Sequence, residues 1–129
     1  MDQQTSRLRV LVVEDESLIR WSIAETLART GHTVIEADNA ESAIRALKEM
    51  SQPVDVVLLD YRLPDSNDLT LLATLRRLLP HTPVVMMTAY GTEDVIGGAL
   101  DLGAYDVLDK PFDMQDLEPM LLQAYAETR

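Results

Sequence analysis

Polar side chains with chemical potential follow four separate apolar runs of this 129-residue chain, at the point where each run ends. The stretch LVVEDES places Glu14 and Asp15 directly after the first run, and Asp60 follows VVLL. Thr88 follows VVMM, and Lys110 ends VLDK. Together these residues supply three carboxylates, a hydroxyl and an ammonium group. Such a set can hold a hard cation and the oxygens of a phosphate.

Carboxylates that meet at one place repel one another. Two like charges about 4 Å apart cost about 4 kcal/mol at an effective dielectric constant near 20. A divalent cation removes that cost, and carboxylates without nearby histidine or cysteine favour Mg²⁺, which keeps other positions for water or phosphate oxygens. The chain contains no cysteine, so thiolate metal sites and disulfides are excluded. If the three carboxylates meet, we therefore expect Mg²⁺ between them.

Taken singly, each of these residues also has an ordinary structural interpretation. Glu14 and Asp15 can favour the N-terminus of a following helix through its dipole. Asp60 can open a loop, Thr88 can cap a helix, and Lys110 can be a solvated surface charge. Only the joint pattern favours a functional site over these alternatives.

Apolar, β-branched runs alternate with segments of helical periodicity, which indicates strands that alternate with helices. The expected strands are Leu8–Val13, Thr33–Ala37, Val54–Leu59, Pro83–Met87 and Tyr105–Asp109. A helix is expected after each strand, and the last helix should begin near Asp116 because Pro119 would disrupt a helix interior. Continuous apolar strands are typical of a parallel sheet covered on both faces. All strands of such a sheet end at one edge, so the five polar groups should meet there.

Composition limits the class of protein. Hydrophobic residues make up 47% of the chain, the formal net charge is −11, and there is no Lys/Arg-rich run, which argues against direct nucleic-acid binding. Met1–Ser6 is polar, and no apolar run approaches the length of a membrane span. We expect a soluble cytoplasmic protein with a disordered tail at 1–6 and one domain at 7–129. His32 and His81 stand beside turn residues and are expected to be exposed, without a role.

With these residues assembled, the chain resembles the receiver domain of bacterial two-component response regulators. The resemblance runs from Arg7 to Tyr125 and is carried by VVEDE, LLDYRLPD, MMTAYG and LDKPFD at matching spacings. TAYG and DKPFD are particularly similar to receivers of enhancer-binding transcription activators, which continue into an ATPase domain and a DNA-binding domain. The resemblance implies a flavodoxin-like three-layer α/β sandwich, with five helices around a five-stranded parallel sheet in the order 2-1-3-4-5.

The resemblance also implies a phosphorylation site that depends on Mg²⁺. Asp60 is expected to accept a phosphoryl group from a phosphohistidine on a sensor histidine kinase. The metal is expected to be held by Asp15, Asp60 and the backbone carbonyl of Arg62, and to be reached by Glu14 through water. Positioning and charge neutralisation are the main requirements of phosphoryl transfer, and these groups meet them.

Further roles follow from the same resemblance. Thr88 and Lys110 are expected to bind phosphoryl oxygens, and a cis peptide before Pro111 is expected to aim the ammonium group into the site. Arg62 and Tyr90 are expected to flank the site, where they would screen attacking water and so set the phosphoryl lifetime.

The chain departs from the family pattern at two positions. Most receivers carry an aromatic switch residue three positions before the motif lysine, whereas this chain has Val107. We expect either Tyr105 or Tyr90 to share the role of this switch residue. Tyr105 is expected on the same side of the strand as Val107. Asp68 replaces a glycine that follows the proline loop, so we expect that loop to be slightly strained or rearranged.

Phosphorylation is expected to remodel the face formed by the fourth helix, fifth strand and fifth helix, and so to control homodimerisation and a transcriptional output domain absent from this chain. The protein would then be a switch that assists its own phosphorylation and dephosphorylation, and not an enzyme. A phosphatase with an Asp nucleophile remains an alternative, although such enzymes usually carry the nucleophile after the first strand. A nucleotide-binding or flavin-binding module normally needs a phosphate cradle where EDES supplies anions. The remaining alternative is a phosphorylation-independent interaction module, because Val107 interrupts the aromatic relay.

Overall fold

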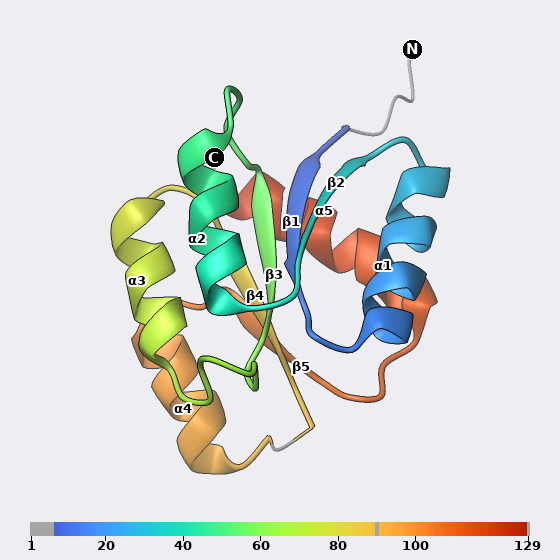
Figure 1. Ribbon diagram of the computed structural model, residues 1–129. Helices are drawn as coiled ribbons and strands as arrows, with labels where there is room; N and C mark the ends of the chain where they lie inside the picture. The colour runs from blue at the N-terminus through green and yellow to red at the C-terminus, as the bar shows by residue number, and fades with distance from the viewer. Residues whose placement is uncertain (1–6, 90, 129) are drawn as a thin grey trace.

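One parallel sheet forms the centre of the computed structural model, which describes residues 7–89 and 91–128 (Figure 1). Its strands are β1 (Arg9–Val13), β2 (Thr33–Ala37), β3 (Val56–Asp60), β4 (Val84–Thr88) and β5 (Asp106–Asp109). They pair in parallel in the order β2-β1-β3-β4-β5. The predicted sheet and strand order are therefore confirmed. The predicted tail at 1–6 lies outside the described residues.

Helices cover both faces of the sheet and complete the predicted three layers. They are α1 (Ser17–Arg29), α2 (Ala40–Glu49), α3 (Thr70–Leu78), α4 (Glu93–Asp101) and α5 (Leu117–Thr128), with a short 3₁₀ turn η1 (Met114–Asp116) before α5. Helices α2, α3 and α4 lie on one face, and α1 and α5 lie on the other (Figure 1). No helix within the described ranges has the length and apolar character needed to cross a membrane.

The apolar strands supply two cores because successive side chains point to opposite faces of a sheet. Leu11 and Val13 belong to the α2–α4 core, the cluster in which the sheet packs against α2, α3 and α4. Val10 and Val12 belong to the α1–α5 core on the other face. Every residue of β3 and β4 is buried. This burial on both faces explains why the strands are apolar without alternation, as predicted.

Local capping fixes where several helices begin. The Asn39 side chain accepts a hydrogen bond from the Ser42 N–H at 2.7 Å at the start of α2, and Thr92 caps α4. Asp113 caps η1, which leads directly into α5. Pro119 lies in the first turn of α5, where a missing N–H costs little, so the predicted start of this helix is correct to within one residue.

The two histidines have different surroundings. His81 is exposed, as expected, but the expectation that His32 is exposed is wrong, because His32 is only 5% exposed. Its Nδ1 accepts a hydrogen bond from the Leu8 N–H at 2.9 Å, and its Nε2 lies 2.6 Å from Glu118 Oε2. The ring therefore donates its Nε2 proton to Glu118. Glu118 lies in the first turn of α5, 86 positions along the chain.

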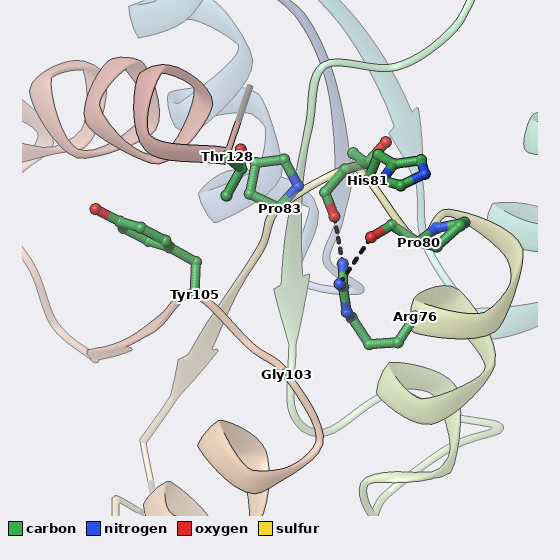
Figure 2. Close-up of a pocket in the computed structure, with 8 residues that line it drawn as sticks. Arg76, Pro80, His81, Pro83, Gly103, Tyr105 and Thr128 are labelled. Carbon is green, nitrogen blue, oxygen red and sulfur yellow. Dashed lines mark hydrogen bonds between the residues drawn. The ribbon is translucent and has the colours of Figure 1, made fainter.

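A cavity of about 300 Å³ lies at the amino edge of the sheet, where β4 and β5 begin (Figure 2). Arg76 closes the turn between α3 and β4 beside this cavity, and its Nη1 donates to the Thr82 carbonyl at 2.6 Å. Gly103 has a φ of 101°, and a Cβ there would lie 3.0 Å from Arg76 Nε. Glycine fits this position for both reasons.

Candidate functional site

The opposite, carboxyl edge of the sheet brings together the polar residues singled out by the sequence. Glu14 and Asp15 follow β1, Asp60 ends β3, Thr88 ends β4 and Lys110 follows β5. Since β3 lies between β1 and β4, Asp60 is central. These five residues line one cavity of about 260 Å³. The predicted convergence of three carboxylates, a hydroxyl and an ammonium group is therefore present.

The three carboxylates form a compact acidic cluster. Glu14, Asp15 and Asp60 each place one oxygen within 4.8 Å of the oxygens of the other two. Glu14 and Asp60 are buried, whereas Asp15 is exposed. Carboxylate oxygens with an open, solvent-facing side are the donor set that Mg²⁺ takes in proteins, so these residues fit the predicted metal.

Lys110 lies between two of these acids. Its Nζ donates to Glu14 Oε1 at 2.7 Å and lies 3.3 Å from Asp60 Oδ2. Burial of the ammonium group opposes its charge, but the hydrogen bond with Glu14 and the charge of Asp60 outweigh burial and raise the pKa of Lys110. The lysine therefore remains charged and pairs with both carboxylates.

Asp60 is held in an environment that disfavours its charged form. Burial, with a further contribution from the negative charge of Glu14, raises the pKa of Asp60 from 3.8 to about 6, although Lys110 acts in the opposite direction. Without a metal, the positive charge of Lys110 only partly offsets the negative charge of the carboxylates. A cation placed among the carboxylates would lower this pKa and favour the ionised oxygen that can act as a nucleophile.

Main-chain hydrogen bonds fix the turn that carries Glu14 and Asp15. The Glu14 N–H donates to the Ala37 carbonyl at 3.0 Å, and the Glu16 N–H donates to Glu14 Oε2 at 3.1 Å. Arg20 Nη1 donates to the Glu14 carbonyl at 2.8 Å. Our sequence reasoning did not identify Arg20. Its only signal was a cation one turn into the helix that follows the acidic stretch.

The β4 and β5 ends are joined beside the site. The Lys110 N–H donates to the Thr88 carbonyl at 2.8 Å, and the Thr88 side chain is almost completely buried. The peptide bond between Lys110 and Pro111 is cis, as predicted. Arg62 lines the same cavity, while Tyr90 lies outside the described residues.

Tyr105, one of the two aromatic residues expected to share the switch role, packs on the opposite side of the sheet from Val107. Val107 packs against the α2–α4 core, whereas Tyr105 packs against the α1–α5 core and donates its hydroxyl to Glu127 Oε1 at 2.6 Å. The expectation that Tyr105 lies on the same side of the strand as Val107 is therefore wrong. Strand alternation does not extend to Tyr105, because β5 begins one residue later, at Asp106.

The loop that carries Asp68 has no left-handed strain at that residue. No non-glycine residue in the described ranges has a positive φ, so Asp68 does not adopt the left-handed conformation that a glycine allows. Instead, Asp68 Oδ1 accepts the Thr70 N–H at 2.9 Å, and this hydrogen bond lowers the pKa of Asp68. The carboxylate thereby supports the start of α3.

Comparisons with known proteins agree with this geometry. The Response regulator protein PilR of Pseudomonas aeruginosa is 39% identical over 119 residues, which cover 92% of this chain and 26% of PilR. The DNA-binding transcriptional regulator NtrC of Proteus hauseri is 35% identical over 120 residues, which cover 93% of this chain and 25% of NtrC. This chain thus spans about a quarter of the length of these curated relatives.

Structural similarity covers nearly the whole chain. A CheY-like response regulator receiver domain protein from Methanospirillum hungatei matches with a TM-score of 0.88 and 26% identity, covering 95% of this chain and 97% of that protein. The family model described as "Response regulator receiver domain" matches residues 10–122. The predicted similarity to receivers of enhancer-binding activators is confirmed by these relatives. The chain therefore belongs to the response regulator receiver domain family.

Proposed function

We propose that this domain, at residues 7–129, accepts a phosphoryl group on Asp60 from a phosphohistidine of a sensor histidine kinase. The main support for this proposal is the position of Lys110. The Lys110 ammonium lies 3.3 Å from the Asp60 carboxylate, in a cavity that Glu14 and Asp15 also line. Phosphoryl transfer depends mainly on positioning and on neutralising oxygen charge, which this arrangement serves. Because Asp60 stands at the end of the third strand and not of the first, this switch is favoured over an Asp-nucleophile phosphatase.

In the proposed reaction, a carboxylate oxygen of Asp60 forms a bond to phosphorus. The bond between phosphorus and the imidazole nitrogen breaks, and its electron pair returns to the imidazole ring. The Lys110 ammonium and the Thr88 hydroxyl bind the oxygens of the transferred group. Mg²⁺ would supply further neutralisation of oxygen charge at this place.

Asp15, Asp60 and the carbonyl of Arg62 would hold the Mg²⁺ ion directly. Glu14 has both carboxylate oxygens in hydrogen bonds, one with Lys110 and one with the Glu16 N–H. These bonds support the proposal that Glu14 reaches the metal through water and not by direct coordination.

The consequence of phosphorylation would be a population shift on the face formed by α4, β5 and α5. Movement of Thr88 toward the phosphoryl group would be transmitted to α4, which begins at Glu93. This face would control homodimerisation and a C-terminal transcriptional output domain, working in the cytoplasm beside the kinase. The domain would assist its own phosphorylation and dephosphorylation, with Arg62 and Tyr90 setting the phosphoryl lifetime.

Mass measurement after incubation with acetyl phosphate and Mg²⁺ tests the proposal. Wild-type protein is expected to gain the mass of one phosphoryl group, and Asp60→Asn is expected to gain none. Omission of Mg²⁺ should also prevent the gain. Equal modification of wild type and Asp60→Asn would contradict the assignment of Asp60.

A further inference from the structure

We propose that Arg20 is a positioning residue for the cation site, and that its contact with the main chain of Glu14 sets the affinity for Mg²⁺. This inference rests on the metal site of the proposed function. It concerns a residue that does not itself touch the acidic cavity. The guanidinium group would act by holding the turn that carries two of the three acids.

The contacts of Arg20 connect three elements. Arg20 belongs to α1, its Nη1 donates to the Glu14 carbonyl at 2.8 Å, and its Nε lies 3.1 Å from Glu36 Oε1 on β2. The Arg20 side chain is 20% exposed, and Glu36 is 47% exposed. A planar guanidinium can donate in two directions at once, so Arg20 connects the end of β1 to both α1 and β2.

The N-terminus of α1 lacks a side-chain cap, so contacts from other residues matter for holding it in place. Glu16 occupies the N-cap without a side-chain hydrogen bond to the helix, and the first turn holds no acidic residue. The helix therefore lacks a side-chain cap of its own, and the Glu16 N–H donates instead to Glu14 Oε2. Arg20 adds a second side-chain connection between α1 and the acidic turn, through the carbonyl of Glu14.

The backbone of Glu14 is thereby held on both sides. Its N–H donates to the Ala37 carbonyl on β2 at 3.0 Å, and its carbonyl accepts from Arg20. The next residue, Asp15, is exposed and follows from this fixed peptide. The direction in which Asp15 presents its carboxylate to Asp60 thus depends on a peptide plane that Arg20 restrains.

Electrostatics and positioning predict opposite effects for the loss of Arg20. Removal of a positive charge near a divalent cation site should strengthen Mg²⁺ binding by Coulomb's law. Loss of an outer contact that orients metal ligands weakens metal binding, commonly by tenfold or more. The sign of the change in Mg²⁺ affinity therefore separates the two effects.

The test is a Mg²⁺ titration of unphosphorylated protein, monitored through the NMR signals of the backbone amides of residues 14–16. Arg20→Gln is expected to weaken Mg²⁺ binding about tenfold relative to wild type. Arg20→Lys keeps the charge but offers only a point donor, so its affinity should lie between those of wild type and Arg20→Gln. Arg29→Gln removes the same charge from the exposed end of the same helix and should bind Mg²⁺ like wild type.

Thermal unfolding without Mg²⁺ provides the structural readout. A purely structural role would lower the unfolding midpoint of Arg20→Gln and leave its Mg²⁺ dissociation constant at the wild-type value. Equal or tighter Mg²⁺ binding by Arg20→Gln would therefore overturn the inference. If Arg20→Gln does not fold, wild-type affinity in Arg20→Lys would overturn it, and weaker affinity would support it.

The outcome is distinct from that of the phosphorylation test. A chain that binds Mg²⁺ but gains no phosphoryl group on Asp60 would contradict the proposed function and leave the role of Arg20 supported by the titration. A wild-type chain that binds no Mg²⁺ would overturn the role of Arg20 together with the metal site.

Discussion

Lys110 at the carboxyl edge of the sheet and Arg76 at the amino edge are both partly buried cations, and their surroundings are opposite. At the carboxyl edge, Lys110 faces the carboxylates of Glu14 and Asp60. At the amino edge, Arg76 faces main-chain carbonyls of Leu79, Pro80 and Thr82 at distances between 2.6 and 3.3 Å. Figure 2 shows its hydrogen bond with Pro80. The lysine meets an excess of negative charge, whereas the arginine meets neutral acceptors that it satisfies.

The two cations also differ in how far along the chain their hydrogen-bond partners lie. The three carbonyls lie three, four and six positions after Arg76, so a local turn satisfies this side chain. Glu14 lies 96 positions from Lys110, so only the complete fold assembles that pair. Unbalanced charges that are brought together by the fold can respond to a bound ligand. A charged group whose hydrogen bonds are satisfied within a local turn mainly stabilises the fold. We therefore expect Lys110 to matter for chemistry and Arg76 to matter for stability.

The largest expected effect follows from removal of the ammonium group. Lys110→Ala should slow phosphoryl acceptance from acetyl phosphate about 100-fold, because a preorganised donor to the transferred oxygens is lost. Time-resolved mass measurement of the phosphorylated fraction gives the rate. Lys48→Ala, which removes the other lysine of the chain from the exposed end of α2, is the matched control and should behave like wild type.

A folded Lys110→Ala protein is part of this expectation. Circular dichroism should show the wild-type helix content, because the α1–α5 and α2–α4 cores do not depend on the lysine. A wild-type rate of phosphoryl acceptance, or a loss of rate that merely follows unfolding, would remove the proposed difference between the two edges.

The sequence predicted the carboxyl edge better than the amino edge. Strand ends are visible as the points where apolar runs meet polar residues, and a parallel sheet places all such ends together. Glu14, Asp60 and Lys110 could therefore be identified as neighbours before their distances were known. The strand order itself came from the family resemblance and not from periodicity.

Contacts made by single side chains across the fold were not predictable. The burial of His32 depends on Glu118, and nothing in the local sequence around His32 indicates that partner. The contact of Arg20 with Glu36, 16 positions along the chain, depends on how α1 packs beside β2. The side of the sheet on which Tyr105 packs depends on β5 beginning one residue after it. Residue patterns predict which elements meet, but they do not fix such side-chain directions.

The acid excess at the carboxyl edge predicts a specific dependence of stability on pH. The pKa of Asp60 is about 6 in the folded protein and is near 3.8 ordinarily, so the folded state binds this proton more tightly. The resulting stabilisation is fully present below pH 4 and is lost as the pH rises through 6, by at most about 3 kcal/mol. Without Mg²⁺, Asp60→Asn should therefore unfold at a higher temperature than wild type at pH 7.5, and this advantage should disappear near pH 4.

Asp68→Asn provides a control of opposite sign in the same thermal measurements. Its hydrogen bond from the Thr70 N–H lowers the pKa of Asp68, so its contribution to stability is present at neutral pH and is lost as the pH falls. Asp68→Asn should thus be no more stable than wild type at pH 7.5. An Asp60→Asn protein with the same pH dependence as wild type would mean that the fold does not strain the ionised Asp60.

A smaller effect is expected at the amino edge. Arg76→Ala should lower the free energy of unfolding by about 2 kcal/mol, because three carbonyl acceptors lose a charged donor. Chemical denaturation measures this change, with the exposed neighbour Arg77→Ala as the control. The rate of phosphoryl acceptance by the folded fraction should stay at the wild-type value. A slower rate in folded Arg76→Ala would show that the two edges are coupled.

The smallest effect on phosphoryl chemistry is expected for Tyr105, which lines the amino-edge cavity. Its hydrogen bond to Glu127 raises the pKa of Tyr105 to about 12, and its ring packs against the α1–α5 core, away from the side on which Val107 packs. Tyr105→Leu keeps an apolar side chain there, so the lifetime of the phosphoryl group, followed by mass, should match wild type. A clearly altered lifetime would restore Tyr105 as a substitute for the missing aromatic switch. Because that side chain belongs to the amino edge, such a result would also place part of the switch outside the acidic site.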